Sequence, residues 1–220
     1  MGRNIKEMAK YIIISGVDGS GKTTVIEGVR KALEADGKKL GYIWMRYNFK
    51  LTTLMHAIAK LTGLSYKEET PMGVKWLHRF YNSRLFCWFY LRCYYVDNIW
   101  AKEKPVKLAE REELDYVICD RWVNDIIIDL GSELHKMDIL ESKWYGKFQN
   151  LLPKDSYQFV VIRDKKDVLD CRVENSFNEA FGYRYALYEK IVNKPNIHRV
   201  DNTGTIENAI NQVLDIIKRH

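Results

Sequence analysis

The sequence predicts an α/β protein in which five short strands form a parallel sheet with helices on both faces. Apolar runs too short for helices recur along the 220-residue chain, and segments with helical apolar spacing separate them. A run that is apolar throughout is typical of a strand buried on both sides, as the strands of a parallel sheet are. Since no repeat or linker interrupts this alternation, we expect one domain over residues 1–220.

Strands and helices are expected to alternate. The first strand covers 11–15, and a helix over 23–35 follows it, because apolar residues recur there at helical spacing and Gly37 ends the pattern. The last helix is expected to begin after Thr205, a residue type that caps helix N-termini. The other strands are predicted at 40–45, 116–120, 157–164 and 197–201, and the other helices at 50–63 and roughly 74–102, with a polar loop at 65–73.

A glycine-rich turn, Gly-Val-Asp-Gly-Ser-Gly-Lys-Thr at residues 16–23, joins the first strand to its helix. It matches the G-x-x-x-x-G-K-[ST] pattern in the expected strand–helix context. Glycines allow backbone N–H groups to converge on an anion, and the helix adds the positive end of its dipole. Lys22 is expected to reach the β- and γ-phosphates of ATP, and Thr23 to ligate Mg²⁺. The expected nucleotide-binding residues are Gly16, Asp18, Gly19, Ser20, Gly21, Lys22, Thr23 and Thr24.

A second acid, Asp120, ends the third predicted strand. Ligands of parallel sheets bind beyond the carboxyl ends of the strands, so Asp120 and the phosphate loop would lie at one edge. We expect Asp120 to hold Mg²⁺ through water, and the alternative is a helix cap. The next residue, Arg121, is harder to explain by structure alone and suggests a second anion beside the triphosphate.

The segments SGVDGSGKTT and VICDRW resemble the thymidylate kinase family, in which an acid lies inside the phosphate loop and Asp-Arg-aromatic ends the third strand. The segment RVDNTGTIENAI before the last helix also fits, and Arg46 in WMRYN lies where the family has the arginine of Thr-Arg-Glu-Pro. The arginine of the long helix before Asp120 would be Arg92, with Arg84 as the alternative, and the lid helix would end in Arg172. The resemblance touches most of the chain and is strongest at the first and third strands.

This resemblance implies a P-loop nucleoside monophosphate kinase fold, with strand order 2-3-1-4-5 and a small lid at about residues 172–186. It implies that ATP phosphorylates a small acceptor that already carries a phosphate, dTMP or a related nucleotide, as a step of nucleotide biosynthesis. Asp18 would contact the acceptor sugar, Arg46 and Arg121 would hold its phosphate, and Arg92 and Asp125 would lie at the acceptor. The expected catalytic residues are Lys22, Asp120, Arg121 and the lid arginines Arg172 and Arg184. For Arg184 the alternative is an exposed helical arginine.

Two departures from the family pattern concern the acceptor. Tyr47 and Asn48 replace Glu-Pro, and Leu130 stands where the family has a glutamine near the acceptor base. Asp125 and Asp129 lie four residues apart on one helical face. These two acids either form a solvated face or contact acceptor hydroxyls or a metal. The identity of the acceptor base therefore stays open.

The segment 76–100 is rich in Trp, Phe and Tyr. These side chains either form core and a subunit contact, or provide a stacking platform for an acceptor ring, with Phe80, Tyr81 or Tyr94 as its face. Since the corresponding helix contributes to both the base pocket and dimerisation in the family that the chain resembles, a homodimer through this helix is expected.

The overall charge and the cysteines bear on partners and location. The net charge of +6 suits a polyanionic ligand, but lysines are scattered among acids, so nucleic acid is not an expected partner. The most apolar run, residues 85–96, is too short to cross a bilayer, and no secretory leader is expected. The four cysteines lack metal or disulfide spacing, which indicates a cytoplasmic setting.

Two other functions stay open at this stage. A kinase could phosphorylate a hydroxyl of a nucleoside or nucleic-acid end, with Asp18 or Asp125 as the base. An NTPase could instead use hydrolysis as a conformational switch. Arginines that converge on an acceptor phosphate favour transfer to a phosphorylated acceptor. An acid within reach of a bound sugar hydroxyl would favour the hydroxyl kinase, and a cleft without an acceptor pocket would favour the switch.

Overall fold

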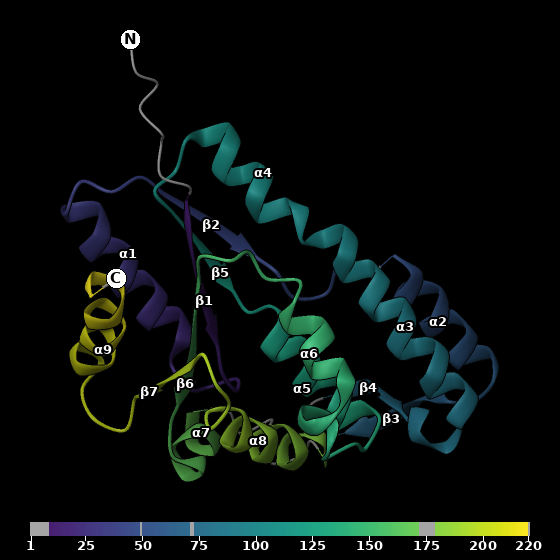
Figure 1. Cartoon of the computed structure of the whole chain (residues 1–220). Coiled ribbons are helices and arrows are strands. Elements are labelled where there is room, and N and C mark those ends of the chain that lie inside the picture. The colour runs from purple at the N-terminus through teal and green to yellow at the C-terminus, as the bar shows by residue number, and fades with distance from the viewer. Residues whose placement is uncertain (1–8, 49, 71–72, 172–178, 220) are drawn as a thin grey trace.

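The structure is a computed structural model that describes residues 9–48, 50–70, 73–171 and 179–219. Its centre is a five-stranded parallel sheet in the spatial order β2-β5-β1-β6-β7 (Figure 1). The predicted α/β class, with a five-stranded parallel sheet flanked by helices, is confirmed. The strands of this sheet are β1 (Lys10–Ser15), β2 (Leu40–Trp44), β5 (Tyr116–Asp120), β6 (Ser156–Ile162) and β7 (Ile197–Asp201).

Helices cover both faces of the sheet. Ile12 and Ile14 of β1 belong to one buried cluster, with α1 and α9, and Tyr11 and Ile13 belong to the other. Figure 1 shows α1 and α9 on one side of the sheet and α3 to α6 on the other. The helices are α1 (Lys22–Ala35), α2 (Leu51–Leu61), α3 (Arg84–Ala101), α4 (Glu103–Glu112), α5 (Val123–Glu133), α6 (Lys143–Gln149), α7 (Lys165–Cys171), α8 (Glu179–Ile191) and α9 (Ile206–Lys218).

The strand register brings several strand ends to one edge of the sheet. Ile14 of β1 and Trp44 of β2 both pair with Asp120, the last residue of β5. The segments that follow β1, β2 and β5 therefore begin at neighbouring positions on the carboxyl edge. Ligands of open parallel sheets bind at this edge.

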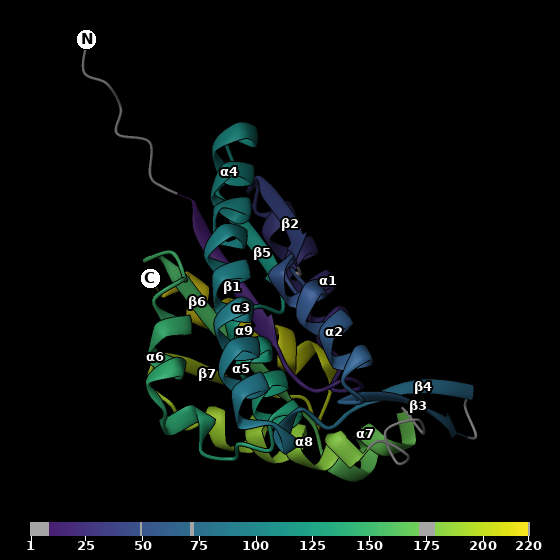
Figure 2. The ribbon, with the colours of Figure 1, turned by 90° about the vertical axis from the view of Figure 1, so that its right-hand side faces the viewer.

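The prediction for residues 65–83 was wrong in part. Strands β3 (Ser65–Thr70) and β4 (Gly73–His78) form an antiparallel hairpin, where a loop and the start of a helix were expected. Figure 2 shows this hairpin at one end of the molecule, apart from the main sheet. The aromatic helix begins only at Arg84, because the Ser83 hydroxyl accepts a hydrogen bond from the Phe86 amide and caps it. The high aromatic content of the region conceals this change of period in the sequence.

The C-terminal helix matches its prediction. The Thr205 hydroxyl accepts a hydrogen bond from the Asn208 amide at the start of α9. Across the described ranges, no helix combines the length and apolar character needed to cross a bilayer.

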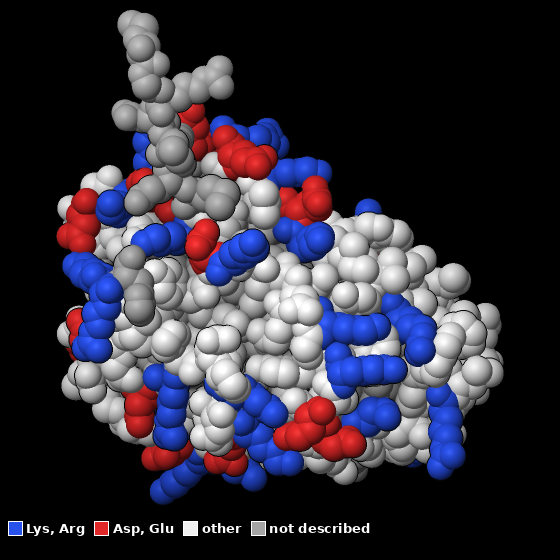
Figure 3. Space-filling model, in the orientation of Figure 1, with Lys and Arg blue, Asp and Glu red and all other residues white. Residues whose placement is uncertain are grey.

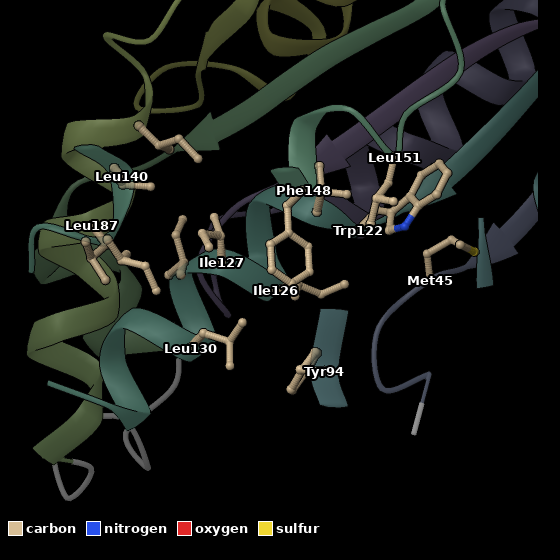
Figure 4. Packing of buried hydrophobic residues seen from close by; sticks show 14 of the residues in the cluster. Met45, Tyr94, Trp122, Ile126, Ile127, Leu130, Leu140, Phe148, Leu151 and Leu187 are labelled. Carbon is tan, nitrogen blue, oxygen red and sulfur yellow. The ribbon is translucent and has the colours of Figure 1, made fainter. Parts of the chain in front are cut away.

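The buried core beneath the carboxyl edge is centred on α5 (Figure 4). Trp122, Ile126, Ile127 and Leu130 have no exposed surface. Leu130, which stands where the thymidylate kinase family has a glutamine near the acceptor base, lies in this core (Figure 4). Phe80 and Tyr94, two candidate stacking faces, are likewise buried and belong to the core.

Candidate functional site

The glycine-rich turn between β1 and α1 has the backbone conformation that only glycine adopts easily. Gly16 has φ 149° and Gly21 has φ 91°. A Cβ atom on Gly16 would lie 2.5 Å from the carbonyl oxygen of Val161. The Asn202 side chain donates a hydrogen bond of 2.8 Å from Nδ2 to the Ser20 carbonyl, and a Cβ atom on Gly21 would collide with that same amide. Tight packing against β6 and β7 therefore holds the turn in shape.

Lys22 lies folded over this turn. Its Nζ donates a hydrogen bond of 2.7 Å to the Val17 carbonyl and lies 4.0 Å from Asp18 Oδ1. Burial, and to a lesser extent the positive charge of Arg121, lower the pKa of Lys22 to about 8. Thr23 and Thr24 follow on the first turn of α1 and are exposed.

Asp18 lies between two arginines that follow different strands. Arg121 Nη2 forms an ion pair with Asp18 Oδ1, and Arg46 Nη1 lies 3.7 Å from Asp18 Oδ2. The Asp18 side chain is 52% exposed, whereas both arginines are buried. Partial burial would raise the pKa of the Asp18 carboxyl, but the two arginines and Lys22 together lower it below its usual value. Three cationic side chains thus converge on one carboxylate.

Arg121 adopts an uncommon backbone conformation for a residue with a side chain. Its φ of 65° lies in the left-handed region, and its amide donates a hydrogen bond of 2.9 Å to Ile14 of β1. This turn directs the side chain back over the phosphate loop, where Nη1 donates to the Gly16 carbonyl at 3.3 Å. Such strain persists only where the surroundings hold it, and it is frequent at functional sites.

Two acids of α5 hold the same arginines. Asp125 accepts a hydrogen bond of 2.9 Å from Arg121 Nη1, and Asp129 accepts bonds of 3.0 Å from both Nε and Nη2 of Arg46. Each arginine therefore directs its other terminal nitrogen, Nη2 of Arg121 and Nη1 of Arg46, towards Asp18. The two acids share one helical face as predicted, but they are 1% and 4% exposed, so the solvated-face alternative is wrong.

Helix α8 adds two further side chains to this arrangement. Arg184 Nε lies 3.1 Å from Asp129 Oδ1, and the Tyr188 hydroxyl donates a hydrogen bond of 2.6 Å to Asp125 Oδ1. The Arg184 side chain is only 24% exposed, which does not match the alternative of an exposed helical arginine. We call Lys22, Asp18, Arg46, Arg121, Asp125, Asp129 and Arg184 the charged cluster.

Asp120 lies beside the phosphate loop at the end of β5. The hydroxyl of Tyr42, from β2, donates a hydrogen bond of 2.8 Å to Asp120 Oδ2. Burial and this contact raise the pKa of Tyr42 to about 12. The observed contact is with a strand side chain and not with a helix N-terminus. Within the described ranges no three or more His, Cys, Asp or Glu side chains gather as a metal site.

Two predicted arginines are not part of the charged cluster in the structure. The guanidinium of Arg92 lies 3.4 Å from the centre of the Trp88 ring, and its Nη1 donates to the Trp88 carbonyl. Arg84, the alternative to Arg92, lines a pocket together with Arg92 and Trp88, and no residue of the charged cluster lines that pocket. Arg172 and the rest of residues 172–178, which begin the expected lid, lie outside the described residues. Residues 179–186, the remainder of the expected lid, belong to α8.

Sequence reasoning missed four residues that support the site. Asn202 lies within the segment RVDNTGTIENAI, but nothing in the pattern indicates that its amide holds the phosphate loop. Tyr42 of β2 donates a hydrogen bond to Asp120, and Tyr188 of α8 donates one to Asp125. Both tyrosines lie far from these acids in the sequence. Glu133, whose carboxylate accepts a 2.8 Å hydrogen bond from Tyr90, extends the acidic face of α5 by one turn. The spacing of four from Asp129 to Glu133 was the one signal available in the sequence.

No protein-family model matches the chain, and a search of curated proteins finds no significant match.

Proposed function

We propose that the protein is a thymidylate kinase-like phosphotransferase of the P-loop class. It transfers the γ-phosphoryl group of ATP to a small acceptor that already carries a phosphate, most simply a nucleoside monophosphate. The observation that carries this proposal is the convergence of Lys22, Arg46 and Arg121 on Asp18, a residue of the phosphate loop. The observed strand order β2-β5-β1-β6-β7, which corresponds to the expected 2-3-1-4-5, supports the P-loop assignment.

The place between the two arginines suits an acceptor phosphate. Arg46 and Arg121 each have one side of the guanidinium bound by a buried acid and another N–H directed at Asp18. Arginine N–H groups arranged in this way bind phosphate oxygens with defined direction. A phosphate that replaced the Asp18 carboxylate there would free Asp18 to accept hydrogen bonds from acceptor hydroxyls. A switch NTPase has no need of a second anion site.

The triphosphate would occupy the turn between β1 and α1. Gly16 and Gly21 carry no Cβ atom that would obstruct converging backbone amides, and Lys22 would leave the Val17 carbonyl for the phosphates. Thr23 at the helix start and Asp120 at the end of β5 supply only oxygen atoms, which fits Mg²⁺ held by few protein ligands and substrate phosphates. Mg²⁺ bound there would neutralise charge on the β- and γ-phosphates.

In the proposed reaction an oxygen of the acceptor phosphate attacks the γ-phosphorus, and the bond from that phosphorus to the β-bridging oxygen breaks, so ADP leaves. Enzymes of this type act chiefly by positioning the groups and by neutralising charge. Arg46 and Arg121 would position the acceptor, and Lys22 would stabilise charge on the transferred group. Arg184, which reaches the cluster from α8, would contribute from the lid side, together with Arg172.

A panel of candidate acceptors tests this proposal. Nucleoside monophosphates, nucleosides and a short oligonucleotide would each be incubated with Mg²⁺ and ATP, with Lys22→Ala as the blank. We expect ADP release and a doubly phosphorylated product with at least one monophosphate. Phosphorylation of nucleosides or oligonucleotide ends alone would replace the proposal by a hydroxyl kinase. ATP hydrolysis that no acceptor accelerates would replace it by an NTPase switch.

A further inference from the structure

A second pocket lies between α3, the end of α5 and α6, and no residue of the phosphate loop lines it. Its volume is about 570 Å³, within the range of pockets that hold small-molecule ligands. We call it the α3–α6 pocket. Its polar and aromatic lining residues are Tyr81, Arg84, Trp88, Arg92, His135, Lys136 and Trp144.

The α3–α6 pocket is cationic. Arg84, Arg92 and Lys136 line it, and no Asp or Glu does. In the part of the chain that the structure describes, none of these three cations forms an ion pair with a carboxylate. Figure 3 shows Lys and Arg side chains close together over the end of the molecule that contains α3 and α6, with few acids among them. A concave surface with uncompensated positive charge favours an anionic ligand.

One side of the pocket is a stack of planar groups. The Arg92 guanidinium lies 3.4 Å from the centre of the Trp88 ring and 5.6 Å from that of Trp144, and its Nη1 is held by the Trp88 carbonyl at 3.0 Å. Lys147 lies 4.8 Å from the Trp144 ring centre. These contacts fix the orientation of two indole rings, of which Trp88 is 49% exposed.

A second stack provides another aromatic face. Tyr81 lies parallel to His135, with ring centres 3.7 Å apart, and His135 in turn stacks on Tyr183 at 4.7 Å. His135 reaches this position from a left-handed backbone conformation with φ 51° at the end of α5. Tyr81 is 38% exposed. Aromatic rings held in place by neighbours lose little entropy when a flat ligand stacks on them.

We propose that the α3–α6 pocket binds a small anion that carries a flat aromatic ring, the chemistry of a nucleoside monophosphate. Arg84 and Lys136, both exposed, would bind the phosphate, and Trp88 or Tyr81 would stack on the ring. The proposal does not rest on the phosphotransferase function, because no lining residue shares a described hydrogen bond or ion pair with the phosphate loop.

Side-chain NMR signals of tryptophan report on the two sites separately. The indole N–H signals of ¹⁵N-labelled protein would be assigned with Trp88→Phe, Trp144→Phe and Trp44→Phe variants. Trp44 packs on Tyr47 beside Arg46, so it reports on the charged cluster. We expect AMP to shift the Trp88 and Trp144 signals with a saturable dependence on concentration. Adenosine, which lacks the phosphate, should bind at least about tenfold more weakly than AMP. The same is expected of inorganic phosphate and ribose 5-phosphate, which lack the aromatic ring.

Charge variants test the phosphate contacts. The double variant Arg84→Ala, Lys136→Ala should weaken AMP binding in the pocket by about tenfold or more. The double variant Lys31→Ala, Lys38→Ala, which removes the same charge from exposed positions of α1 and its end, should not. Unshifted Trp88 and Trp144 signals at millimolar AMP would overturn the proposal, as would equal affinity for AMP and inorganic phosphate. A shift of Trp44 alone would place AMP in the charged cluster and also overturn it.

Discussion

Arg46 and Asp129 face each other through two hydrogen bonds of 3.0 Å, although 83 residues separate them in the chain. The pair joins the segment after β2 to the middle of α5, and both side chains are buried. Because two guanidinium nitrogens are bound in this way, Arg46 has a single defined orientation with Nη1 towards Asp18. Asp129 also binds Arg184, so one carboxylate orients two of the arginines in the charged cluster.

Removal of the Asp129 charge should destabilise the protein. Asp129→Asn leaves the buried Arg46 without its counter-charge, so we expect the free energy of unfolding to fall by about 3 to 5 kcal/mol. Urea unfolding followed by circular dichroism measures this. Asp138→Asn, an exposed acid after the end of α5, is the matched control and should change stability by less than about 0.5 kcal/mol. Equal effects of the two substitutions would contradict a stabilising role of the buried Arg46–Asp129 pair.

Arg121 should affect the acceptor more than ATP. Arg121→Ala removes an N–H that is directed at the proposed phosphate position, so we expect acceptor-dependent turnover to fall by about a hundredfold or more. ATP affinity, measured by calorimetry, should change by less than about fivefold. Arg111→Ala, on the exposed end of α4, serves as the control. A parallel loss of turnover and ATP affinity would contradict the assignment of Arg121 to the acceptor.

The amide of Asn202 should support the phosphate loop. Asn202→Ala removes the hydrogen bond to the Ser20 carbonyl, and a net loss of about 1 kcal/mol corresponds to roughly a fivefold weaker affinity for ATP. Asn193→Ala, an exposed asparagine after α8, should leave the affinity unchanged. Unaltered ATP affinity in Asn202→Ala would mean that the loop holds its shape without this bond.

The lowered pKa of Lys22 predicts a pH dependence of ATP binding. Triphosphate binding favours the charged ammonium, so ATP affinity should be constant below about pH 8 and fall above it, by up to about tenfold per pH unit. Calorimetry in two buffers would detect proton uptake on binding above pH 8. Lys22→Met keeps most of the side-chain volume and should abolish this uptake. Proton uptake that persists in Lys22→Met would assign the titration to another group.

Glu133 should make stability depend on pH in the opposite sense to an ordinary paired carboxylate. Burial and the neighbouring Asp129 raise the pKa of Glu133 to about 7, above its ordinary value of 4.5. As pH rises from 4.5 to 7 the unfolded chain ionises first, so Glu133 lowers stability over this interval and the loss persists at higher pH.

Glu133→Gln isolates this contribution. The variant should therefore be more stable than the parent at pH 8, by about 1 to 3 kcal/mol, and lose this advantage at pH 4. Glu141→Gln, an exposed acid, is the matched control. A stability difference that does not change with pH would show that folding does not shift the pKa of Glu133.

Residues close together in the sequence made part of this site predictable. The glycines, Lys22 and Thr23 belong to one contiguous turn, and Asp120 and Arg121 end one apolar strand. The acidic face of α5 follows from a spacing of four on a helix. The five strands of the main sheet and the capped start of α9 were predictable for the same reason, because local patterns specify them.

Long-range packing decided the rest. Asp129 is paired and not solvated because the segment after β2 places Arg46 against α5. A local sequence pattern cannot predict this contact, since the two residues are 83 positions apart. The same holds for Arg92, whose helix turns it towards two tryptophans and away from the charged cluster, and for Asn202, which reaches the loop from 182 residues away. The hairpin β3–β4 was missed because β3 is polar and resembles a loop, and β4 was assigned to the start of the aromatic helix. The order of the strands and the packing of the helices on the sheet determine which distant residues come into contact. Contacts of this kind orient the arginines around Asp18.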